Sequence, residues 1–490
     1  MMQLNRTTSN TAKKSPERIM QFGGGNFLRA FVDWMFDILN KQTDFDGSIV
    51  VIKPTQRGDY IELKEQEGLF HVALDGVRKG SLVSEVTLVE SISRVIQPYT
   101  QWEEYLELAQ NPDMRFIISN TTEAGIKFSV SDTIEKKPPH EFPAKLTIWL
   151  HHRFQHFNGQ KDKGCIILPC ELIEQNGDVL KSTILQYASH WELGTEFIHW
   201  IEEANYFCNT LVDRIVSGYP DERSKEILKE IGYHDSLLVA GEDYHSWIIQ
   251  GEDIVQTELP FSKTNLNVQF VEDSTDYREM KVRILNGAHT AMVPIGYLSG
   301  LRTVKEVMDD TLVSTFINDL LSQEIGPTLK NFPKDVVDEF IHETLDRFRN
   351  PTLKHFLISI SLNSTSKFVA RLLPTLKDCI KNNRQLPKRI VFALSCLFRF
   401  YQGTYNNENI ALNDNPEALE SFSKHWKSHQ NESITYLQMV SYLLRDTTIW
   451  GENLDTINGL SEAITENLRA IEKHGIATVI KQITDLKSLV

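Results

Sequence analysis

The sequence predicts an α/β domain over residues 18–273, followed by a mostly α-helical domain over residues 274–490. Two observations lead to this prediction. In the first half, short apolar runs of strand length alternate with segments of helical periodicity. From Tyr277 onward the pattern is almost wholly helical, and prolines interrupt it. The polar stretch 272–276 lies between the two parts and carries helix-capping residues, so we place the boundary there.

The length and composition exclude several classes of protein. A chain of 490 residues is long enough for two or three domains, and its formal charge of −15 disfavours nucleic acid as a partner. No apolar run reaches the ~18 residues of a membrane span, and residues 1–17 form a loose polar tail unlike a signal peptide. We therefore expect a cytoplasmic protein without a membrane segment. No protein partner is evident. The five cysteines form no CxxC pair, which predicts reduced, buried thiols and no metal site.

A dinucleotide-binding turn is predicted at Gly23-Gly24-Gly25, between an apolar run at 18–22 and a helical pattern over 28–39. Glycines let the backbone approach a pyrophosphate, and a helix N-terminus offers it free N–H groups. The motif thus favours a Rossmann-like domain, although Leu28 occupies the usual third glycine position and a plain tight turn is an equally good interpretation of the motif alone. The predicted cofactor-binding residues are Ile19, Met20, Gln21, Phe22, Gly23, Gly24, Gly25, Asn26, Phe27, Leu28, Arg29 and Ala30.

The cofactor preference depends on the residues after the next predicted strand, at 48–53. The end of this strand is where an acidic residue would bind the adenosine ribose of NAD. No acid stands at the strand end itself, so Asp59 is the candidate, and Arg57 leaves a 2′-phosphate, and hence NADP, open. The expected cofactor is NAD.

Polar residues also follow a predicted buried strand at 114–119. Asn120, Thr121 and Glu123 are candidates for contact with the nicotinamide ribose, since ligands bind outside the carboxyl ends of such strands. A solvated loop accounts for these residues nearly as well. The next buried strand, at 164–170, ends at Glu171. Other predicted elements are a strand pair at 69–74 and 82–89, a strand at 266–271, and helices at 99–109, 144–157, 179–190 and 196–207.

The central feature of the second half is a long, mostly apolar helix predicted over residues 277–301. Counted at about 100° per residue from Lys281, Asn286 falls at about 140° and His289 at about 80°, so the three side chains share one arc. Desolvation lets a half-buried amine exchange protons nearer pH 7, and the amide and imidazole could hold an oxygen. The alternative is that all three are ordinary polar residues of a half-exposed helix.

Several segments together resemble the mannitol dehydrogenase family of polyol-specific long-chain dehydrogenases. They are FGGGNFLRAF, SNTTEAG, ILPCE, NTLVDRI, KVRILNGAH and RFRNP, and they occur in one order along nearly the whole chain. The family's catalytic lysine, asparagine and histidine fall on Lys281, Asn286 and His289. The resemblance implies zinc-independent hydride transfer with NAD. It is strongest to the members that interconvert the sugar acids D-tagaturonate and D-altronate in hexuronate catabolism.

Two departures from the polyol-specific members bear on the substrate. Leu172 stands where those members have an asparagine that helps to bind the reacting oxygen. Arg278 stands where they commonly have glutamate, and a cation there suits an anionic sugar acid, although Arg278 is equally well explained as a helix-end charge. Arg349 and Lys354, in and after the RF-x-NP stretch, are competing candidates for substrate binding.

Three alternatives remain open at this level. A related enzyme could act on fructuronate and mannonate, or on a neutral polyol, because one sequence does not encode the stereochemistry of the substrate. A protein of another class could sense a nucleotide with the same fold and without turnover. The presence of Lys281, Asn286 and His289 argues against this last alternative.

Overall fold

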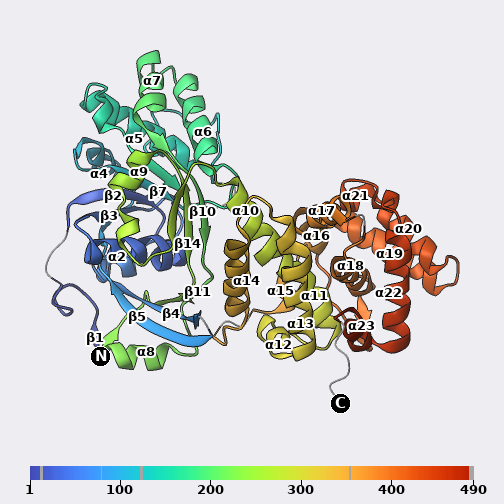
Figure 1. The fold of residues 1–490 in the computed structure, drawn as a ribbon. Coiled ribbons are helices and arrows are strands. Elements are labelled where there is room, and N and C mark those ends of the chain that lie inside the picture. The colour runs from blue at the N-terminus through green and yellow to red at the C-terminus, as the bar shows by residue number, and fades with distance from the viewer. Residues whose placement is uncertain (12–14, 79, 122–124, 353–354, 384, 485–490) are drawn as a thin grey trace. The chain divides into compact units, whose positions relative to one another are not determined.

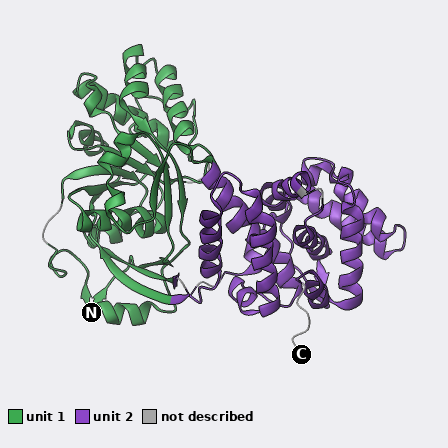
Figure 2. Ribbon diagram, in the orientation of Figure 1, with its two compact units in different colours: residues 1–76, 82–275 green, residues 77–81, 276–490 purple. Residues whose placement is uncertain are grey.

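The computed structural model describes residues 1–11, 15–78, 80–121, 125–352, 355–383 and 385–484. The chain forms two compact units (Figure 2). Unit 1 consists of Met1–Gly76 and Leu82–Thr275, and unit 2 consists of Val77–Ser81 and Asp276–Val490. Unit 1 combines a parallel sheet with helices, whereas unit 2 is mostly helical, so the predicted fold class is confirmed.

A six-stranded parallel sheet forms the centre of unit 1 (Figure 1). Across the sheet the strands lie in the order β6 (Ile92–Ile96), β3 (Ser48–Ile52), β2 (Glu17–Phe22), β7 (Phe116–Ser119), β8 (Ile166–Pro169) and β9 (Tyr206–Phe207). Numbered by their sequence order, these six strands run 3-2-1-4-5-6, the arrangement of a doubly wound dinucleotide-binding sheet. The order reverses between β2 and β7, which is where such a sheet binds its ligand.

Alternate residues of the strands face two separate cores. Ile49 and Val51 of β3 pack into one core with α1 (Asn26–Leu28), η1 (Arg29–Asp33) and α2 (Trp34–Gln42). Val50 and Ile52 point the opposite way, because successive side chains of a strand alternate, and they pack into the second core. The helices of this second core are α4 (Trp102–Glu107), α5 (Phe142–His156), α6 (Asn176–His190) and α7 (Thr195–Ala204). Both faces of the sheet are thus covered.

Two smaller sheets of unit 1 were predicted only in part. One has the order β11 (Val216–Gly218), β13 (Val239–Glu242), β4 (Phe70–Arg78), β5 (Ser81–Val89), and the other has the order β10 (Asn209–Asp213), β14 (Ser246–Gln250), β15 (Val268–Val271). The predicted strands at 69–74, 82–89 and 266–271 correspond to β4, β5 and β15. The predicted helix at 196–207 ends at Ala204, because Tyr206 and Phe207 pair with β8 as a strand. The short helices of unit 1 are α3 (Ile61–Glu65), α8 (Ser224–Ile231) and α9 (Asp253–Glu258).

The expectation of a loose N-terminal tail is wrong for the part that the structure describes. Met2 and Gln3 pair in parallel with Tyr233 and His234 of β12. Leu4 is completely buried, and the Arg6 guanidinium donates hydrogen bonds to backbone carbonyls of the β5–β6 connection and of β6. One apolar side chain and one guanidinium anchor the segment, a signal too small to recognise in a polar stretch.

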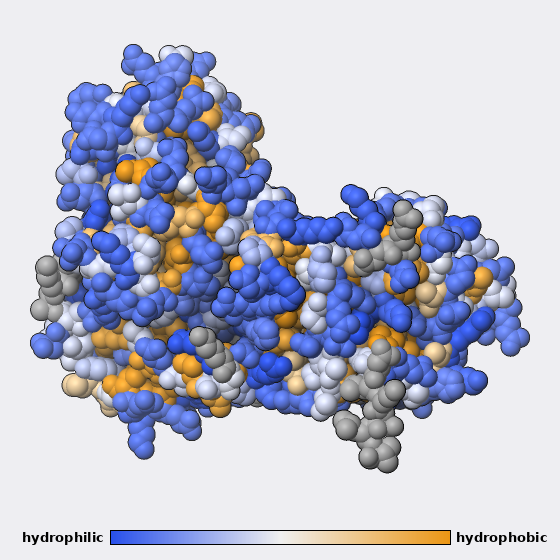
Figure 3. Space-filling view, viewed as in Figure 1, coloured by the Kyte–Doolittle hydropathy of each residue, from blue (hydrophilic) through white to orange (hydrophobic). Residues whose placement is uncertain are grey.

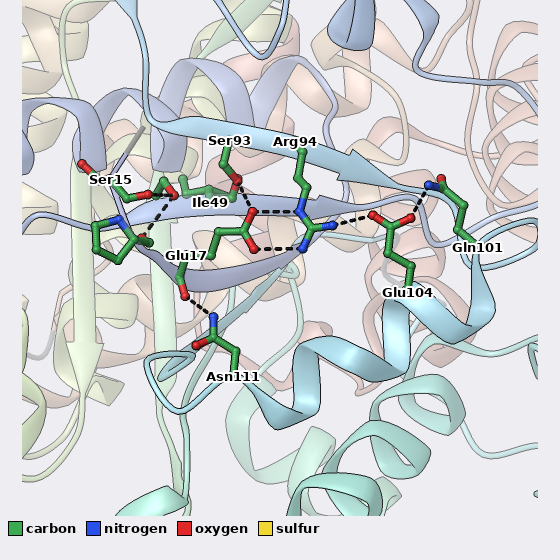
Figure 4. Close-up of polar contacts among 10 residues, drawn as sticks. Ser15, Glu17, Ile49, Ser93, Arg94, Gln101, Glu104 and Asn111 are labelled. Atoms are coloured by element: carbon green, nitrogen blue, oxygen red, sulfur yellow. Dashed lines mark hydrogen bonds and ion pairs between the residues drawn. The ribbon is translucent and has the colours of Figure 1, made fainter. Parts of the chain in front are cut away.

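An ion-pair network secures the edge strand β6 (Figure 4). Arg94 of β6 forms a two-point contact with Glu17 of β2, with Nε–Oε1 at 2.8 Å and NH2–Oε2 at 2.9 Å. Its third nitrogen contacts Glu104 of α4. Asn111 donates to the Glu17 carbonyl at 2.9 Å. The network therefore joins β2, β6 and α4 beside the strand that leads into the glycine turn.

Unit 2 is built on the segment that the sequence singled out. The predicted helix at 277–301 is three connected helical segments, α10 (Thr275–Lys281), the π-helical turn η5 (Val282–Asn286) and α11 (Gly287–Leu298). Every residue of α11 except Tyr297 is buried. Its side chains form a core with those of the surrounding helices, so α11 is the central element of the unit.

The other elements of unit 2 are α12 (Val304–Asp309), α13 (Thr311–Asp319), η6 (Leu320–Ile325), η7 (Gly326–Thr328), α14 (Lys334–Phe348), α15 (Leu357–Ile360), α16 (Ser364–Arg371), α17 (Leu373–Asn383), α18 (Lys388–Phe400), β16 (Thr404–Tyr405), β17 (Glu408–Asn409), α19 (Pro416–Gln430), α20 (Tyr436–Arg445), α21 (Thr447–Trp450), η8 (Leu454–Thr456), α22 (Leu460–His474) and α23 (Ile476–Ile483).

The face shown in Figure 3 is mainly hydrophilic, with hydrophobic residues in scattered patches. None of the helices within the described ranges is long and apolar enough to cross a membrane. All five cysteines are buried and form no disulfide. No group of three or more His, Cys, Asp and Glu side chains among the described residues is placed to hold a metal ion.

Candidate functional site

The turn after β2 and the turn after β7 touch at the point where the strand order reverses. Gly23 has a φ of 112°, a conformation that favours glycine. A Cβ atom at Gly23 would lie 3.1 Å from Leu28 Cδ1 and 3.2 Å from the Asn120 carbonyl oxygen. The backbone therefore needs glycine at position 23, and Leu28, at the usual third glycine position, packs against the space that the missing side chain leaves.

Gly24 lies in crowded surroundings, whereas Gly25 lies in open space. A Cβ at Gly24 would lie 3.1 Å from the Tyr60 ring, and the Gly24 N–H donates to the Tyr60 hydroxyl at 3.0 Å. Gly25 is exposed, and a Cβ there would meet no atom within 4 Å. Gly25 precedes the continuous helical segment α1-η1-α2, whose first N–H groups have no intrahelical acceptor. Open space beside these N–H groups fits a pyrophosphate.

Most other predicted cofactor residues of this segment support the turn from within. Ile19, Met20, Gln21, Phe22, Leu28, Arg29 and Ala30 are buried. The Arg29 guanidinium donates to the Asn26 side chain at 2.6 Å and to the Leu237 carbonyl. Asn26 is exposed, and the half-buried Phe27 stacks on Phe31 with ring centroids 5.0 Å apart. The backbone of the turn, with Asn26, is what the segment offers to a ligand.

The loop after β3 contains the predicted ribose contact and a lysine that sequence reasoning missed. Asp59 is exposed in this loop. Lys53, directly after β3, is buried, and its ammonium group donates to the carbonyls of Thr55 and Arg57, the latter at 2.7 Å. Burial lowers the pKa of Lys53, and the charge of Asp59 opposes this shift. The one sign of Lys53 in the sequence is its position at the end of the strand, where a ribose-binding acid is expected.

Asn120, Thr121 and Glu171 lie together at the carboxyl ends of β7 and β8. The Asn120 side chain donates to the Cys170 carbonyl at 2.6 Å. Glu171 is 3% exposed and accepts hydrogen bonds from the Thr121 N–H at 2.9 Å and from the Ser119 hydroxyl at 3.0 Å. Burial raises the pKa of Glu171, and the bonds from Thr121 oppose the rise. Glu171 thus connects the turn after β8 to the turn after β7. Glu123 lies outside the described residues.

In unit 2, Lys281 and Asn286 bound the π-helical turn η5. Lys281 is the last residue of α10 and Asn286 the last of η5, and both are half-buried. In a π-helix each N–H bonds to the carbonyl five residues earlier, so residues five apart stack on one face. The angle of about 140° between Lys281 and Asn286 assumed an α-helix, and this assumption is wrong for the π-helical turn. His289 follows Asn286 by three residues on α11, the spacing of neighbours on a helix face.

His289 is held by aromatic contacts. It is 8% exposed, and its ring centroid lies 4.5 Å from that of Phe348 and 5.1 Å from that of His355. The backbone carbonyl of Asn286 accepts a hydrogen bond from the Thr290 hydroxyl at 2.9 Å, whereas its side-chain amide makes no hydrogen bond to the residues described by the structure. An imidazole held in this way, three residues along the helix from the Asn286 amide, suits binding to a substrate oxygen.

Two protein-family models match the chain. The mannitol dehydrogenase Rossmann domain matches residues 17–263, and the mannitol dehydrogenase C-terminal domain matches residues 273–472. The chain belongs to the mannitol dehydrogenase family. The resemblance found in the sequence is thereby confirmed, and with it the class of oxidoreductase.

Relatives and solved structures extend this assignment. Altronate oxidoreductases of Escherichia coli (strain K12) and Enterobacter sp. (strain 638) are 43% identical over 469 residues, which cover 96% of this chain and 97% of each relative. A D-sorbitol dehydrogenase structure in substrate-free form aligns with a TM-score of 0.79 and 21% identity, over 98% of this chain and all of the other. The Pseudomonas fluorescens mannitol 2-dehydrogenase ternary complex with NAD and D-mannitol aligns with a TM-score of 0.69 and 21% identity, over 99% and 100%. The two solved structures therefore share the fold of this chain over nearly its whole length.

The residues at which the sequence departs from the polyol-specific members of the mannitol dehydrogenase family, and the other candidate cations, differ in exposure. Leu172 is 66% exposed in the turn after β8. Arg278 is half-buried on α10, three residues before Lys281. Arg349 is exposed and pairs with Asp346 at 3.3 Å. Lys354 lies outside the described residues. Sequence reasoning missed another basic residue, Arg371 of α16, whose NH1 donates to the Thr290 hydroxyl at 3.2 Å.

Proposed function

We propose that this protein is an NAD-dependent oxidoreductase that interconverts D-tagaturonate and D-altronate. The observation that carries the proposal is the 43% identity to altronate oxidoreductases over 96% of the chain. The lysine, amide and imidazole of Lys281, Asn286 and His289, which lie along connected helical segments of unit 2, support it, because reduction of a keto group needs a proton donor and groups that hold the oxygen. A small anionic sugar acid is accordingly the proposed substrate.

The residues at the reversal point of the sheet fit NAD. A Cβ added at Gly25 would meet no atom within 4 Å, and this open space, with the N–H groups that follow it, would hold the pyrophosphate. Asp59 would bind the adenosine ribose hydroxyls, and Asn120 and Thr121 would approach the nicotinamide ribose. When bound, the reduced cofactor supplies the hydride.

The protein's own groups handle the proton and the oxygen. During reduction, the ammonium group of Lys281 donates a proton to the developing alkoxide. During oxidation, the neutral amine of Lys281 removes the proton of the hydroxyl group. Asn286 and His289 donate hydrogen bonds to the same oxygen and stabilise the charge that develops on it. Proton transfer from a positioned group contributes about 10²–10⁴-fold to a rate.

The cation that distinguishes a sugar acid from a neutral sugar has three candidates in the sequence, Arg278, Arg349 and Lys354. Arg278 stands closest in sequence to Lys281 and is half-buried, which favours it over the exposed Arg349. A half-buried guanidinium binds a carboxylate more strongly than one in open solvent.

A steady-state assay with NADH and three substrates tests the proposal. Tagaturonate should be reduced with a kcat/KM at least about tenfold above those of fructuronate and of the neutral ketose fructose, because stereochemistry and the carboxylate both contribute to recognition. Preference for fructuronate would assign mannonate as the product, and preference for fructose would assign a polyol dehydrogenase. NADH binding without oxidation by any of the three would indicate a nucleotide-sensing protein.

A further inference from the structure

One of two basic side chains of α16, that of Arg371, contacts the first turn of α11. Lys367 and Arg371 are four residues apart, so they share one face of α16. Arg371 NH1 lies 3.2 Å from the Thr290 hydroxyl and 3.5 Å from the Asn286 carbonyl oxygen. The guanidinium therefore contacts the residue that follows His289 in the chain, and it contacts the backbone of Asn286 itself.

His355 lies beside His289. Its ring packs edge-on against that of His289, with centroids 5.1 Å apart and an interplanar angle of 75°. Burial lowers the pKa of His355, and the positive charge of Lys367 lowers it further. His289 and His355 are thus in ring contact, and Arg371 reaches the neighbouring residues Asn286 and Thr290.

Neither Lys367 nor Arg371 forms an ion pair with an acid among the described residues. Arg371 contacts the neutral oxygens of Asn286 and Thr290, and Lys367 Nζ donates to the Ile360 carbonyl at 2.8 Å. Burial lowers the pKa of both side chains, and the charge of Arg371 lowers that of Lys367 further. The Asp414 carboxylate opposes this shift from a distance, but it accepts hydrogen bonds from Thr365 and Tyr401.

Other largely buried arginines of unit 2 provide the contrast. Arg283 contacts Asp378 and Glu279, both at 2.6 Å, and Arg389 contacts Asp319 at 3.0 Å. Buried charges are normally neutralised in this way, because an unpaired charge with little hydration costs free energy. Two adjacent half-buried cations without a carboxylate in contact would be neutralised by an anion from outside the chain.

We propose that Arg371, assisted by the charge of Lys367, binds the carboxylate of the substrate. This inference rests on the proposed function, which supplies a six-carbon substrate with a keto group near one end and a carboxylate at the other. One helical turn, about 5.4 Å, separates Asn286 from Thr290, the hydroxyl that Arg371 contacts. A guanidinium fork suits a carboxylate, and Lys367 adds a second positive charge without needing direct contact.

The test compares Arg371→Gln with the wild type in the assay with tagaturonate and NADH. The KM for tagaturonate should rise about 10- to 100-fold while kcat changes less than about threefold, because a charge-assisted bond to a non-reacting group is lost. The inhibition constant of altronate should rise by the same factor. Lys367→Gln should raise the KM about three- to tenfold, since it removes charge without the fork.

Three control variants complete the experiment. Arg445→Gln removes an arginine that pairs with Asp455 on the surface of unit 2 and should leave KM unchanged. Arg278→Gln and Arg349→Gln test the two cations nominated by the sequence, and a KM increase for either that exceeds that of Arg371→Gln would overturn the assignment. Circular dichroism and thermal unfolding of each variant establish that it is folded.

The outcomes separate the inference from the proposed function. If the wild type reduces tagaturonate and Arg371→Gln keeps the wild-type KM, or loses kcat instead, only the carboxylate assignment is wrong, and Arg371 serves to hold α11. If the wild type prefers fructuronate, the same comparison is made with that substrate, which also carries a carboxylate. If it reduces no uronate, the proposed function fails and the inference fails with it.

Discussion

Asn286 closes the π-helical turn that begins directly after Lys281. The five residues of this turn replace an α-helical geometry in which the same two side chains would point about 140° apart. The turn therefore changes the direction of the Asn286 side chain relative to that of Lys281 along an otherwise continuous helix.

The first prediction is that Lys281→Ala lowers kcat by about 10²–10⁴-fold and leaves NADH affinity unchanged, because the variant loses the proton donor and keeps all of unit 1. Fluorescence titration with NADH, run beside the assay, measures both quantities. Lys305→Ala is a matched control, since Lys305 is a lysine of unit 2 that pairs with Asp309. Wild-type turnover in Lys281→Ala, with chemistry shown to be rate-limiting, would exclude Lys281 as the acid.

A second prediction concerns the open space at the glycine turn. Gly25→Ala should change the free energy of unfolding by less than about 1 kcal/mol, because the added Cβ meets no atom within 4 Å and the residue has an ordinary φ of −73°. The same substitution should weaken NADH binding about tenfold or more, since the methyl group occupies the space proposed for the pyrophosphate. Thermal unfolding and NADH titration test the two halves. Unchanged NADH affinity would place the cofactor elsewhere.

Gly24→Ala is the matched comparison for that experiment. Its Cβ would lie 3.1 Å from the Tyr60 ring and 3.2 Å from Val51 Cγ1, so the substitution should lower the melting temperature as well as the NADH affinity. Together the two variants distinguish a crowded position of the turn from one that only a ligand would fill.

The third prediction is that kcat/KM for NADH exceeds that for NADPH by at least about tenfold. The exposed carboxylate of Asp59 would repel a 2′-phosphate, and the ammonium group of Lys53 already donates to two loop carbonyls. Asp59→Ser should narrow the ratio. A preference for NADPH in the wild type would instead make Arg57 a phosphate ligand.

The fourth prediction concerns the dependence of stability on pH. Asp33 of η1 is completely buried, and burial raises its pKa to about 8, although Gln21 and Arg29 oppose the rise. Between its ordinary pKa of 3.8 and about 8, the folded protein keeps a proton that the unfolded chain has released. The contribution of protonated Asp33 to stability is complete below the pKa of Asp33 in the unfolded chain. It is lost as the pH rises through the pKa of Asp33 in the folded protein, by up to about 1.4 kcal/mol per pH unit.

Asp33→Asn removes this titratable group and keeps the shape of the side chain. The variant should resemble the wild type near pH 4 and become progressively more stable than the wild type toward pH 8. Urea unfolding at several pH values measures the difference. Parallel pH profiles for the two proteins would show that Asp33 is ionised in the folded state.

The sequence predicted the elements that strong local patterns determine. Strand β2, the glycine turn and the following helix were recognisable because an apolar run, three glycines and a helical periodicity succeed one another. Strand β10 was missed, because Asn209, Thr210 and Asp213 give it a polar composition that only its pairing with β14 explains. The N-terminal strand depends in the same way on a partner more than 200 residues away.

The candidate site was predictable where residue type and spacing suffice, and not where tertiary structure decides. Lys281, Asn286 and His289 stood out as polar residues in an apolar helix, yet the π-helical turn between the first two leaves no trace in hydrophobic periodicity. Arg371 carried no local signal at all. Its significance follows from its contact with Thr290 and from the lack of an ion-paired acid among the described residues, and both are properties of the packed helices.

The contact between Gly23 and Leu28 links the two positions in evolutionary terms. The Leu28 methyl group fills the volume above the Gly23 Cα, so a side chain at position 23 and a leucine at position 28 exclude each other. Homologues that carry leucine at position 28 should therefore also carry glycine at position 23, which the φ of 112° favours independently. A motif search that demands glycine at the third position would pass over every homologue that carries this leucine.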